Sequence, residues 1–481
     1  MYVRKVKGKK ATFFQIGQKV KGRFVLVKHV GSASAPEQIE ILQLKAREEL
    51  GKIKLNRQPS LFPVGGTETR ATLINWRITG FHQIFGHIYD EVGFPKNMLR
   101  ELVISRIAYP KSKSATVRYL DQHLGISLSE DKIYRFLDTL NKDELTKIAF
   151  NFVSKKNNGI ALIFYDVTTL YFEANDEDDL RKKGFSKDHK NELPQIVIRL
   201  FVDRDGYPFD FDSYEGSTFE GHTFPKAIKS LLERYQFTDL VVVADAGMLS
   251  ESNIRFLEIE KLNYIVGARL KSLSEKFKQR IFIHDFTKEI LFDMLCEIKP
   301  ETGGIKERRL IIDFSEKRAK KDKFNREKLI KKLEEKIASK KELIKKSKYL
   351  ILENQGKVAG INQEKIEQDK RHDGLKGYWT NLRAKTKPKE IIDQYHNLWK
   401  VEKAFRMSKS DLQERPIFHR KLKRINGHLL ICFCSLLILK ETERILKPTD
   451  IPLMKAIEIL GKVGQGEMVL GKLKLPIDSE L

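Results

Sequence analysis

The sequence predicts an α/β fold in which a buried β-sheet follows a helical N-terminal region. Two nearly continuous apolar runs, 160–165 and 240–244, are typical of central strands buried on both faces of a sheet. Residues 82–147 instead carry apolar side chains at helical spacing, and residues 271–372 are dominated by Lys and Glu. These patterns favour helices packed on a sheet, with a large insertion before the last core segment.

The bulk composition favours a polyanionic partner and no membrane. The 481 residues suffice for two to four domains, and the net charge of +25 suits nucleic acid, because each neutralised phosphate releases counterions. Only three cysteines occur, which predicts neither a disulfide framework nor a zinc site and favours a reducing compartment. The basic N-terminus has no apolar core, so no signal peptide is expected. The apolar run 429–439 is too short to span a bilayer and predicts a buried helix.

Residues 1–75 are predicted to form a small β-containing module. The runs 11–16 and 23–27 are rich in β-formers and are joined by a Gly/Lys turn. Residues 37–50 then favour a short helix.

Residues 82–147 are predicted to be helical and are a candidate DNA-binding region. Pro110 ends a first helix, Gly125 ends a second, and Ser129 is a suitable N-cap for a third. Basic residues recur along these helices: Arg106, Lys111, Lys113, Arg118, Lys132 and Arg135. Two interpretations remain open, a helix-turn-helix that reads DNA and an ordinary helical bundle with a solvated basic face.

Residues 155–270 are predicted to form the first part of the sheet-containing core. The expected strands are 160–165, 196–202, 207–213, 240–244 and 264–268, with a helix over 250–262. Asp205-Gly206 between the second and third strands is a strong hairpin signal.

The rest of the chain is divided into an insertion, a second core part and a tail. The insertion, 271–372, contains a charged helical stretch with a stripe of Leu329, Leu333, Ile337 and Ile344, which is either solvated or lies on a phosphate backbone. Residues 373–446 are predicted to form two core helices. In the first, Tyr395, Leu398, Glu402, Phe405 and Lys409 share one face, and the second, apolar helix over 428–440 packs beneath. The tail, 447–481, carries no recognisable chemistry.

Three carboxylates are the candidate catalytic and metal-binding residues. Asp166 and Asp245 each follow an apolar strand, where the sites of open sheets gather, although each alone could be a turn or cap residue. Glu402 shares its helical face with apolar residues, so we expect it to point into the protein, although a helical Glu is usually solvated. A buried carboxylate needs a cation or a hydrogen bond. Mg²⁺ takes oxygen ligands, so the chemistry indicated is metal-dependent reaction at DNA phosphodiesters.

These residues lie in motifs that resemble a known family. Tyr165-Asp-Val-Thr-Thr-Leu-Tyr-Phe-Glu173 and Val243-Ala-Asp-Ala-Gly-Met248 resemble the first two catalytic segments of DDE transposases of the IS4 superfamily. The helix resembles that superfamily's Y-(2)-R-(3)-E-(6)-K signature, with Leu398 at the arginine position. The amino-acid sequence around Glu402 is most similar to that of the IS1634 group. The resemblance covers roughly residues 95–440.

The resemblance implies a ribonuclease-H-like mixed sheet with a large insertion domain before the last catalytic helix. Asp166 would lie on the first strand, the 196–213 hairpin would give the second and third, and Asp245 would follow the fourth. Tyr395 and Lys409 would contact DNA phosphate near the scissile bond, and Arg406 would replace the missing arginine.

The implied function is a DNA transposase of an insertion sequence. Asp166, Asp245 and Glu402 would bind Mg²⁺, or Mn²⁺ in its place, for cleavage of the element's ends and strand transfer. The implied partners are double-stranded DNA, as terminal inverted repeats and target, and a second copy in a synaptic homodimer. The implied location is the prokaryotic cytoplasm, on the nucleoid. Two alternatives remain: a ribonuclease-H-like nuclease without strand transfer, and a catalytically silent DNA-binding protein.

Overall fold

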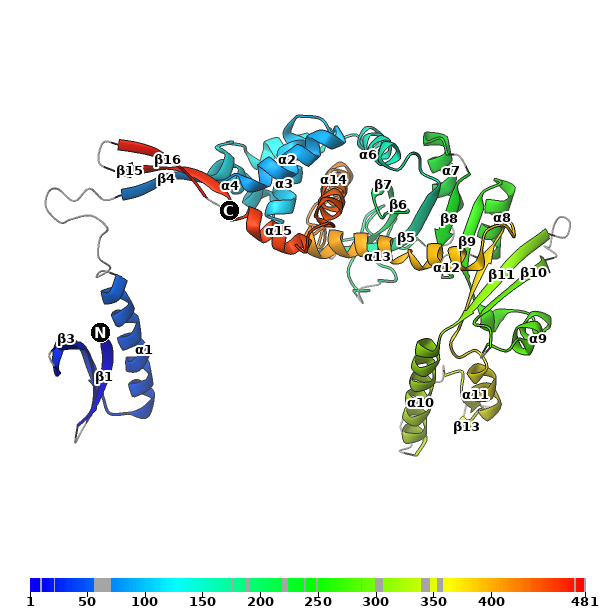
Figure 1. Cartoon of the computed structure of the whole chain (residues 1–481), viewed down its shortest axis with the longest axis horizontal. Helices are drawn as coiled ribbons and strands as arrows, with labels where there is room; N and C mark the ends of the chain where they lie inside the picture. The colour runs from blue at the N-terminus through cyan, green and yellow to red at the C-terminus, as the bar shows by residue number, and fades with distance from the viewer. Residues whose placement is uncertain are drawn as a thin grey trace. The chain divides into compact units, whose positions relative to one another are not determined.

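The computed structural model divides the chain into two compact units. It describes residues 1–8, 11–20, 22–55, 71–174, 176–186, 190–218, 224–237, 239–247, 250–286, 288–298, 306–338, 347–352, 358–470 and 473–479. One unit is Met1–Thr72 with Met468–Leu475, and the other is Leu73–Glu467 with Pro476–Leu481. Figure 1 shows their elements.

The N-terminal unit is a three-stranded antiparallel sheet covered by one helix. Strands β1 (Tyr2–Lys7), β2 (Thr12–Val20) and β3 (Arg23–Ala33) pair in that order, and helix α1 (Pro36–Leu55) contacts all three. Phe14 and Ile16 of β2 and Ala46 of α1 are buried, so these residues form its small core. The two predicted strands lie within β2 and β3, β1 was not predicted, and residues 56–70 lie outside the described part.

The second unit begins with helices that surround the apolar helix predicted near the C-terminus. These are α2 (Gly80–Val92), α3 (Met98–Ala108), α4 (Lys113–Leu124), α5 (Glu130–Leu137) and α6 (Lys142–Lys156). Helix α14 (Leu422–Leu446) contacts α2, α3, α5 and α6 (Figure 1). The helix ends follow the sequence signals: Ser129 caps α5, and Gly125 ends α4 with a left-handed φ of 67°.

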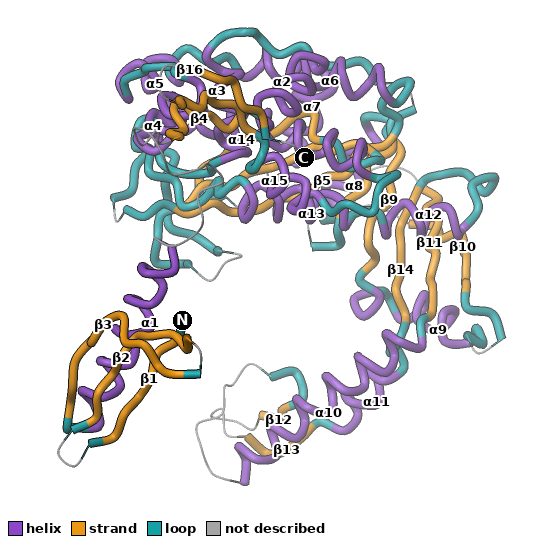
Figure 2. The backbone as a smooth tube through the Cα atoms, turned by 60° about the vertical axis from the view of Figure 1, so that its left-hand side comes forward, coloured by secondary structure: helices purple, strands orange, loops and turns teal. Residues whose placement is uncertain are grey.

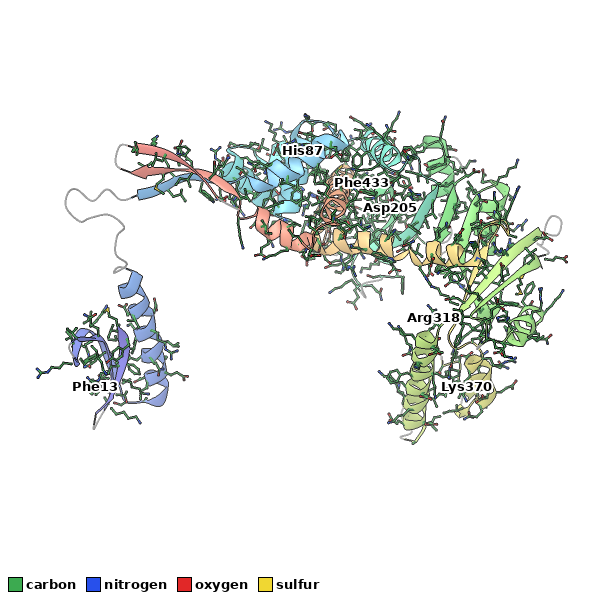
Figure 3. The ribbon with its side chains drawn as sticks, in the orientation of Figure 1. Phe13, His87, Asp205, Arg318, Lys370 and Phe433 are labelled. Atoms are coloured by element: carbon green, nitrogen blue, oxygen red, sulfur yellow. The ribbon has the colours of Figure 1, made fainter. Side chains whose placement is uncertain are left out.

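Helix α14 is long and apolar enough to cross a membrane by length and composition, the single such helix among the described residues. Its seventeen buried residues run from Ile425 to Thr442, and the ring of Phe433, labelled in Figure 3, lies 5.2 Å from that of Phe211. The helix is therefore the core helix that the sequence predicts.

The catalytic sheet has the ribonuclease-H-like topology. Strands β5 (Leu162–Tyr171), β6 (Gln195–Asp203) and β7 (Pro208–Glu215) are antiparallel neighbours, and β8 (Val241–Ala244) and β9 (Asn263–Ala268) continue parallel to β5. Helices α7 (Phe224–Arg234) and α8 (Glu251–Ile259) follow β7 and β8 (Figure 2). One expectation is corrected: β5 does not end before Asp166 but continues to Tyr171, because β6 pairs with it along its length.

The insertion extends this sheet, a feature that the sequence did not predict. Strands β10 (Leu291–Ile298) and β11 (Lys306–Phe314) join it through β14 (Leu375–Thr380), giving eight strands in the order β10-β11-β14-β9-β8-β5-β6-β7. The insertion also holds 3₁₀-helix η1 (Leu270–Ser272), α9 (Glu275–Ile283), the charged helix α10 (Glu316–Ala338), α11 (Gln363–Lys370), and a hairpin of β12 (Leu350–Leu352) and β13 (Val358–Ile361). On α10, Leu333 of the predicted stripe is buried, whereas Ile344 lies outside the described residues.

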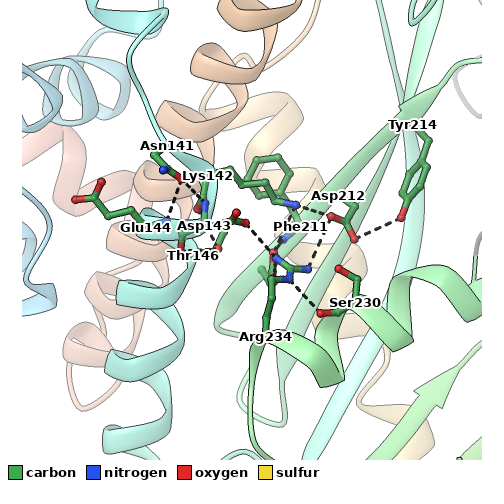
Figure 4. A network of polar contacts seen from close by, with 11 residues as sticks. Asn141, Lys142, Asp143, Glu144, Thr146, Phe211, Asp212, Tyr214, Ser230 and Arg234 are labelled. Carbon is green, nitrogen blue, oxygen red and sulfur yellow. Dashed lines mark hydrogen bonds and ion pairs between the residues drawn. The ribbon is translucent and has the colours of Figure 1, made fainter.

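A polar network ties the helices to the far edge of the sheet. Lys142 at the start of α6 and Arg234 at the end of α7 both approach Asp212 of β7 (Figure 4). Arg234 also lies 2.7 Å from Asp210, whose carboxyl is fully buried. Burial raises the pKa of Asp210 to about 6, and the two cations oppose that rise.

The predicted tail is folded. Helix α15 (Leu453–Leu460) contacts α14 and α2. Strands β15 (Gly464–Leu470) and β16 (Leu473–Asp478) follow it and form a sheet in the order β16-β15-β4, where β4 is Ala71–Ile78. Strand β15 pairs with a strand nearly 400 residues earlier in the chain, which no local pattern indicates.

Candidate active site

Two of the three predicted carboxylates line one pocket of about 310 Å³, here called the carboxylate pocket. Its walls come from β5, helix α13 (Trp399–Arg406), the π-helical turn η2 (Met407–Asp411) and the segment that follows. The lining residues are Asp166, Val167, Thr168, Glu402, Phe405, Arg406, Lys409, Ser410 and Arg415. The fold therefore brings together a strand residue and a helix residue that lie 236 positions apart in the sequence.

Asp245 directly follows β8, the strand that neighbours the one carrying Asp166. Strands β5 and β8 are parallel, and Tyr165 pairs with Ala244 at the last register position. Asp166 and Asp245 are the next residues after this pair, so they lie side by side at the same height along the two neighbouring segments. Asp166 is half-buried and its Oδ1 accepts the Val167 amide at 2.7 Å, whereas Asp245 is exposed.

The Asp245 carboxylate is held by the hydroxyl of Tyr395. Tyr395, on helix α12 (Pro388–His396), is only 5% exposed and donates to Oδ1 of Asp245 at 2.8 Å. Burial and the Asp245 charge raise the pKa of Tyr395 well above its usual value, so the phenol stays protonated. A Cβ on Gly267 of β9 would lie 2.6 Å from this hydroxyl, which explains the glycine. We expected Tyr395 to face DNA phosphate; its hydroxyl instead faces a carboxylate.

The predicted helix with five residues on one face is interrupted. Helix α12 ends at His396 and α13 begins at Trp399, and the amides of Leu398 and Val401 bond three residues back instead of four. Leu398 and Phe405 are buried, as their apolar character requires, but Glu402 is exposed. The expectation that Glu402 points into the protein was therefore wrong: it faces the open carboxylate pocket, where solvent reaches it.

The donor set of this site suits a hard divalent cation. Asp166 and Glu402 contribute carboxylate oxygens to the pocket, and such oxygens are the ligands of Mg²⁺ and Ca²⁺. Among the residues that the structure describes, no three Asp, Glu, His or Cys side chains already form a group that could hold a metal ion. The third carboxylate, Asp245, is adjacent but engaged with Tyr395.

The cations predicted to contact DNA line the same pocket. Lys409 donates from Nζ to Oγ1 of Thr168 at 2.6 Å, and Arg406 is exposed one turn beyond Glu402. Leu398, at the family's arginine position, is buried and lines no part of this pocket. Arg406 therefore lies where a cation can meet a substrate phosphate.

Two functional candidates were missed by sequence reasoning. Lys376 of β14 lies with Nζ 4.5 Å from the centre of the Tyr395 ring. Burial lowers the pKa of Lys376 and nearby Arg318, labelled at the start of α10 in Figure 3, lowers it further, while Asp245 and Glu402 raise it. In the sequence, Lys376 is one lysine among many, and no signal separates it. Thr168 could have been found, because strand alternation places it on the face of Asp166.

The comparisons with known proteins give one family match and several structural similarities at low identity. A family model described as "Transposase DDE domain" matches residues 158–438, more than half of the chain. The structure is similar to a piggyBac transposase synaptic complex with hairpin DNA, at 12% identity and a TM-score of 0.38, covering 86% of this chain and 74% of that one. It is also similar to a Mos1 transposase paired-end complex with the left transposon end, at 10% identity and a TM-score of 0.17. That match covers 46% of this chain and 66% of the Mos1 chain.

A Mos1 strand transfer complex gives 11% identity and a TM-score of 0.17, covering 46% of this chain and 65% of that one. No curated protein matches the sequence. The family match spans β5, β8 and α13, the three elements that carry the candidate carboxylates. The chain belongs to the transposase DDE domain family and is a DDE-type DNA transposase, and enzymes of this family generally use divalent metal ions.

Proposed function

We propose that this transposase cleaves the ends of an insertion sequence of the IS4 superfamily, close to the IS1634 group, and joins them to target DNA with Mg²⁺. The observation that carries the proposal is the shared pocket of Asp166 and Glu402, with Arg406 and Lys409 in its wall. Carboxylates beside cations suit a phosphodiester that is bound by its charge and attacked at a metal-activated centre.

The carboxylates and the cations of the site would have different roles in this reaction. Asp166 and Glu402 would hold Mg²⁺, or Mn²⁺ in its place, and Asp245 would complete the set once its bond to Tyr395 is exchanged. When bound, the metal supplies Lewis acidity and a nucleophilic oxygen at neutral pH. Lys409 and Arg406 would bind the non-reacting phosphate oxygens, so the scissile bond is oriented against the carboxylates.

The substrate proposed is double-stranded DNA, first the terminal inverted repeats and then the target. The net charge of +25 supports this partner, because dispersed Lys and Arg give affinity through phosphate contacts. We also propose a homodimer in the synaptic complex and a place on the prokaryotic nucleoid, both by analogy with the family.

The proposal is tested by a strand-transfer assay on DNA that carries the element's ends. Transfer of the 3′ ends into a second duplex supports it. Nicking without transfer would favour a nuclease, and binding with neither reaction would favour a silent DNA-binding protein. The retained Asp166, Asp245 and Glu402 speak against the silent protein.

Lys409→Ala is expected to weaken end binding through one lost phosphate contact. The slope of log affinity against log salt should fall by about one unit, since one such contact releases roughly one counterion. Affinity for end DNA measured across a salt series checks this. Lys389→Ala on α12, an exposed lysine outside the carboxylate pocket, is the matched control. An unchanged slope with unchanged cleavage would leave Lys409 with only its bond to Thr168.

Tyr395→Phe is expected to reduce cleavage while leaving affinity for end DNA unchanged. The hydroxyl is buried and bonded to Asp245, so its loss alters the position of that carboxylate and not the DNA surface. Cleavage titrated with Mn²⁺ should shift its midpoint, whereas the thermal midpoint should stay close to that of the wild type. A loss of DNA affinity equal to that of Lys409→Ala would instead indicate a direct phosphate contact.

A further inference from the structure

A second pocket, of about 270 Å³, lies between the α3–α4 turn and the segment that follows η2. We name it the cationic pocket, after the basic side chains Arg106, Lys111, Lys113, Arg415, His419 and His428 in its wall. Among the described residues that line it there is no Asp or Glu. The pocket thus concentrates positive charge without acidic neighbours in its own wall.

Two of these cations are buried without polar partners. Arg106 is 7% exposed and Lys113 is 5% exposed, although the sequence suggested a solvated basic face. Within the described part of the chain, neither side chain donates a hydrogen bond or forms an ion pair. The buried carboxyl of Glu414 accepts from Ser408 at 2.6 Å, and the charge of Arg106 acts on it without an ion pair between these two described residues, opposing the rise that burial causes in its pKa. Burying an unpaired charge is costly, so these positions call for an anion.

The two cations also act on the titratable side chains beside them. Burial and the charge of Arg106 together lower the pKa of Lys113 to about 7. Burial, Lys113 and Arg106 together lower the pKa of His419 to about 4, so this ring is neutral. His428, also held neutral, donates from Nε2 to the backbone carbonyl of Glu414 at 3.0 Å. These groups are therefore less charged than the same side chains in water, mainly because they are buried.

The start of α4 adds to this potential. Ser112 is the N-cap of this twelve-residue helix, and its hydroxyl accepts the Ala115 amide at 3.2 Å. Ser112 occupies the Ala115 amide, which leaves the first-turn amides of Lys113 and Ser114 without an acceptor within the helix. A helix N-terminus with free amides favours phosphate and sulfate groups.

Arg415 connects this pocket to the catalytic one. It lines both the cationic pocket and the carboxylate pocket, and it follows η2, the turn that carries Lys409. The two pockets are therefore neighbours that share one wall residue.

We propose that the cationic pocket binds a backbone phosphate of the same DNA strand whose scissile phosphate lies in the carboxylate pocket. This inference rests on the proposed function, because the strand is the transposase substrate. Arg106 and Lys113 supply the charge, and the first turn of α4 supplies amide donors. The pocket fixes the register of the strand, so the bond presented to Asp166 and Glu402 is set by a contact outside the catalytic carboxylates.

The first test uses inorganic phosphate and the free protein. Phosphate in millimolar amounts should raise the thermal midpoint of the wild type, because a ligand that binds only the folded state stabilises it. Lys113→Met should melt no lower than the wild type in chloride, since it removes an unpaired buried charge, and should lose the phosphate-dependent rise. Lys132→Met, at an exposed position on α5, is the matched control and should keep the rise.

The outcomes of this test are decisive for the pocket. Equal phosphate-dependent shifts in the wild type and Lys113→Met, or no shift in the wild type, would overturn it. A drop in the chloride midpoint of Lys113→Met would also count against it, because Lys113 would then have a structural partner. No cleavage is involved, so these results stand apart from the success or failure of the proposed reaction.

The second test distinguishes a DNA phosphate from a free one. End duplexes with a single neutral methylphosphonate, moved one position at a time from the scissile bond, are compared on the wild type and Lys113→Met. One position should weaken binding by the wild type and leave Lys113→Met unaffected, a coupling that a double-mutant cycle isolates. A phosphate-dependent thermal shift without any coupled position would assign the pocket to free phosphate and overturn the DNA assignment.

Discussion

Asp166→Asn should abolish strand cleavage while the protein still folds and binds end DNA. The substitution keeps the shape of the side chain but removes one of the two carboxylate charges in the carboxylate pocket. Metal-assisted stabilisation of the transition-state charge is worth several kcal/mol, so its loss lowers the rate on the order of 10³-fold or more. Glu402→Gln and Asp245→Asn should have the same effect, since each removes a proposed metal ligand.

Affinity separates this effect from misfolding. DNA binding comes from dispersed Lys and Arg contacts, so all three variants should bind the end duplex within about threefold of the wild type. Asp205→Asn, an exposed Asp in the β6–β7 turn that is labelled in Figure 3, is the matched control and should cleave normally. Normal cleavage by any one carboxylate variant would remove that residue from the catalytic assignment.

The parts of the fold that the sequence predicts are those with local signals. The apolar runs at 160–165 and 240–244 became β5 and β8, and the Asp205-Gly206 turn joins β6 to β7. Helix α14 follows from its unbroken apolar character. In each case burial or turn geometry is fixed by residues within a few positions.

The parts that could not be predicted depend on distant partners. Strand β5 continues past Asp166 because β6 supplies backbone hydrogen bonds as far as Tyr171. Strands β10 and β11 look like part of a separate insertion, yet β14 connects them to the catalytic sheet. Periodicity identifies the buried face of an element, but it does not say which element covers that face.

In the site, too, residues with local sequence signals were predicted and contacts between distant segments were not. Asp166 and Glu402 were identified from motif order and spacing, and the structure places both in one pocket. The hydrogen bond from Tyr395 to Asp245 joins residues 150 positions apart, and no sequence pattern in either segment predicts it. For the helices that carry Lys113, a DNA-reading motif and a solvated basic face were both left open. The burial of Lys113 becomes visible only when the segment after η2 packs over the α3–α4 turn.

Metal identity should decide whether bound DNA is cut. We expect Mg²⁺ and Mn²⁺ to support cleavage, and Ca²⁺ to support end binding with cleavage reduced on the order of 10²-fold or more, because its looser and larger oxygen shell positions the reacting oxygens poorly. EDTA should stop the reaction completely. Cleavage and electrophoretic binding measured in parallel with each ion check this.

The position of Asp245 allows the metal experiment to test whether this carboxylate becomes a metal ligand. Only Asp166 and Glu402 share the carboxylate pocket, whereas Asp245 is bonded to Tyr395, so recruitment of the third carboxylate requires exchange of that hydrogen bond. The concentration of Mn²⁺ that gives half-maximal cleavage should therefore differ between the wild type and Tyr395→Phe, but not between the wild type and Lys409→Ala, which acts on DNA. Full activity in EDTA would refute the metal mechanism, and identical Mn²⁺ midpoints in all three proteins would show that Asp245 is not a ligand recruited from Tyr395.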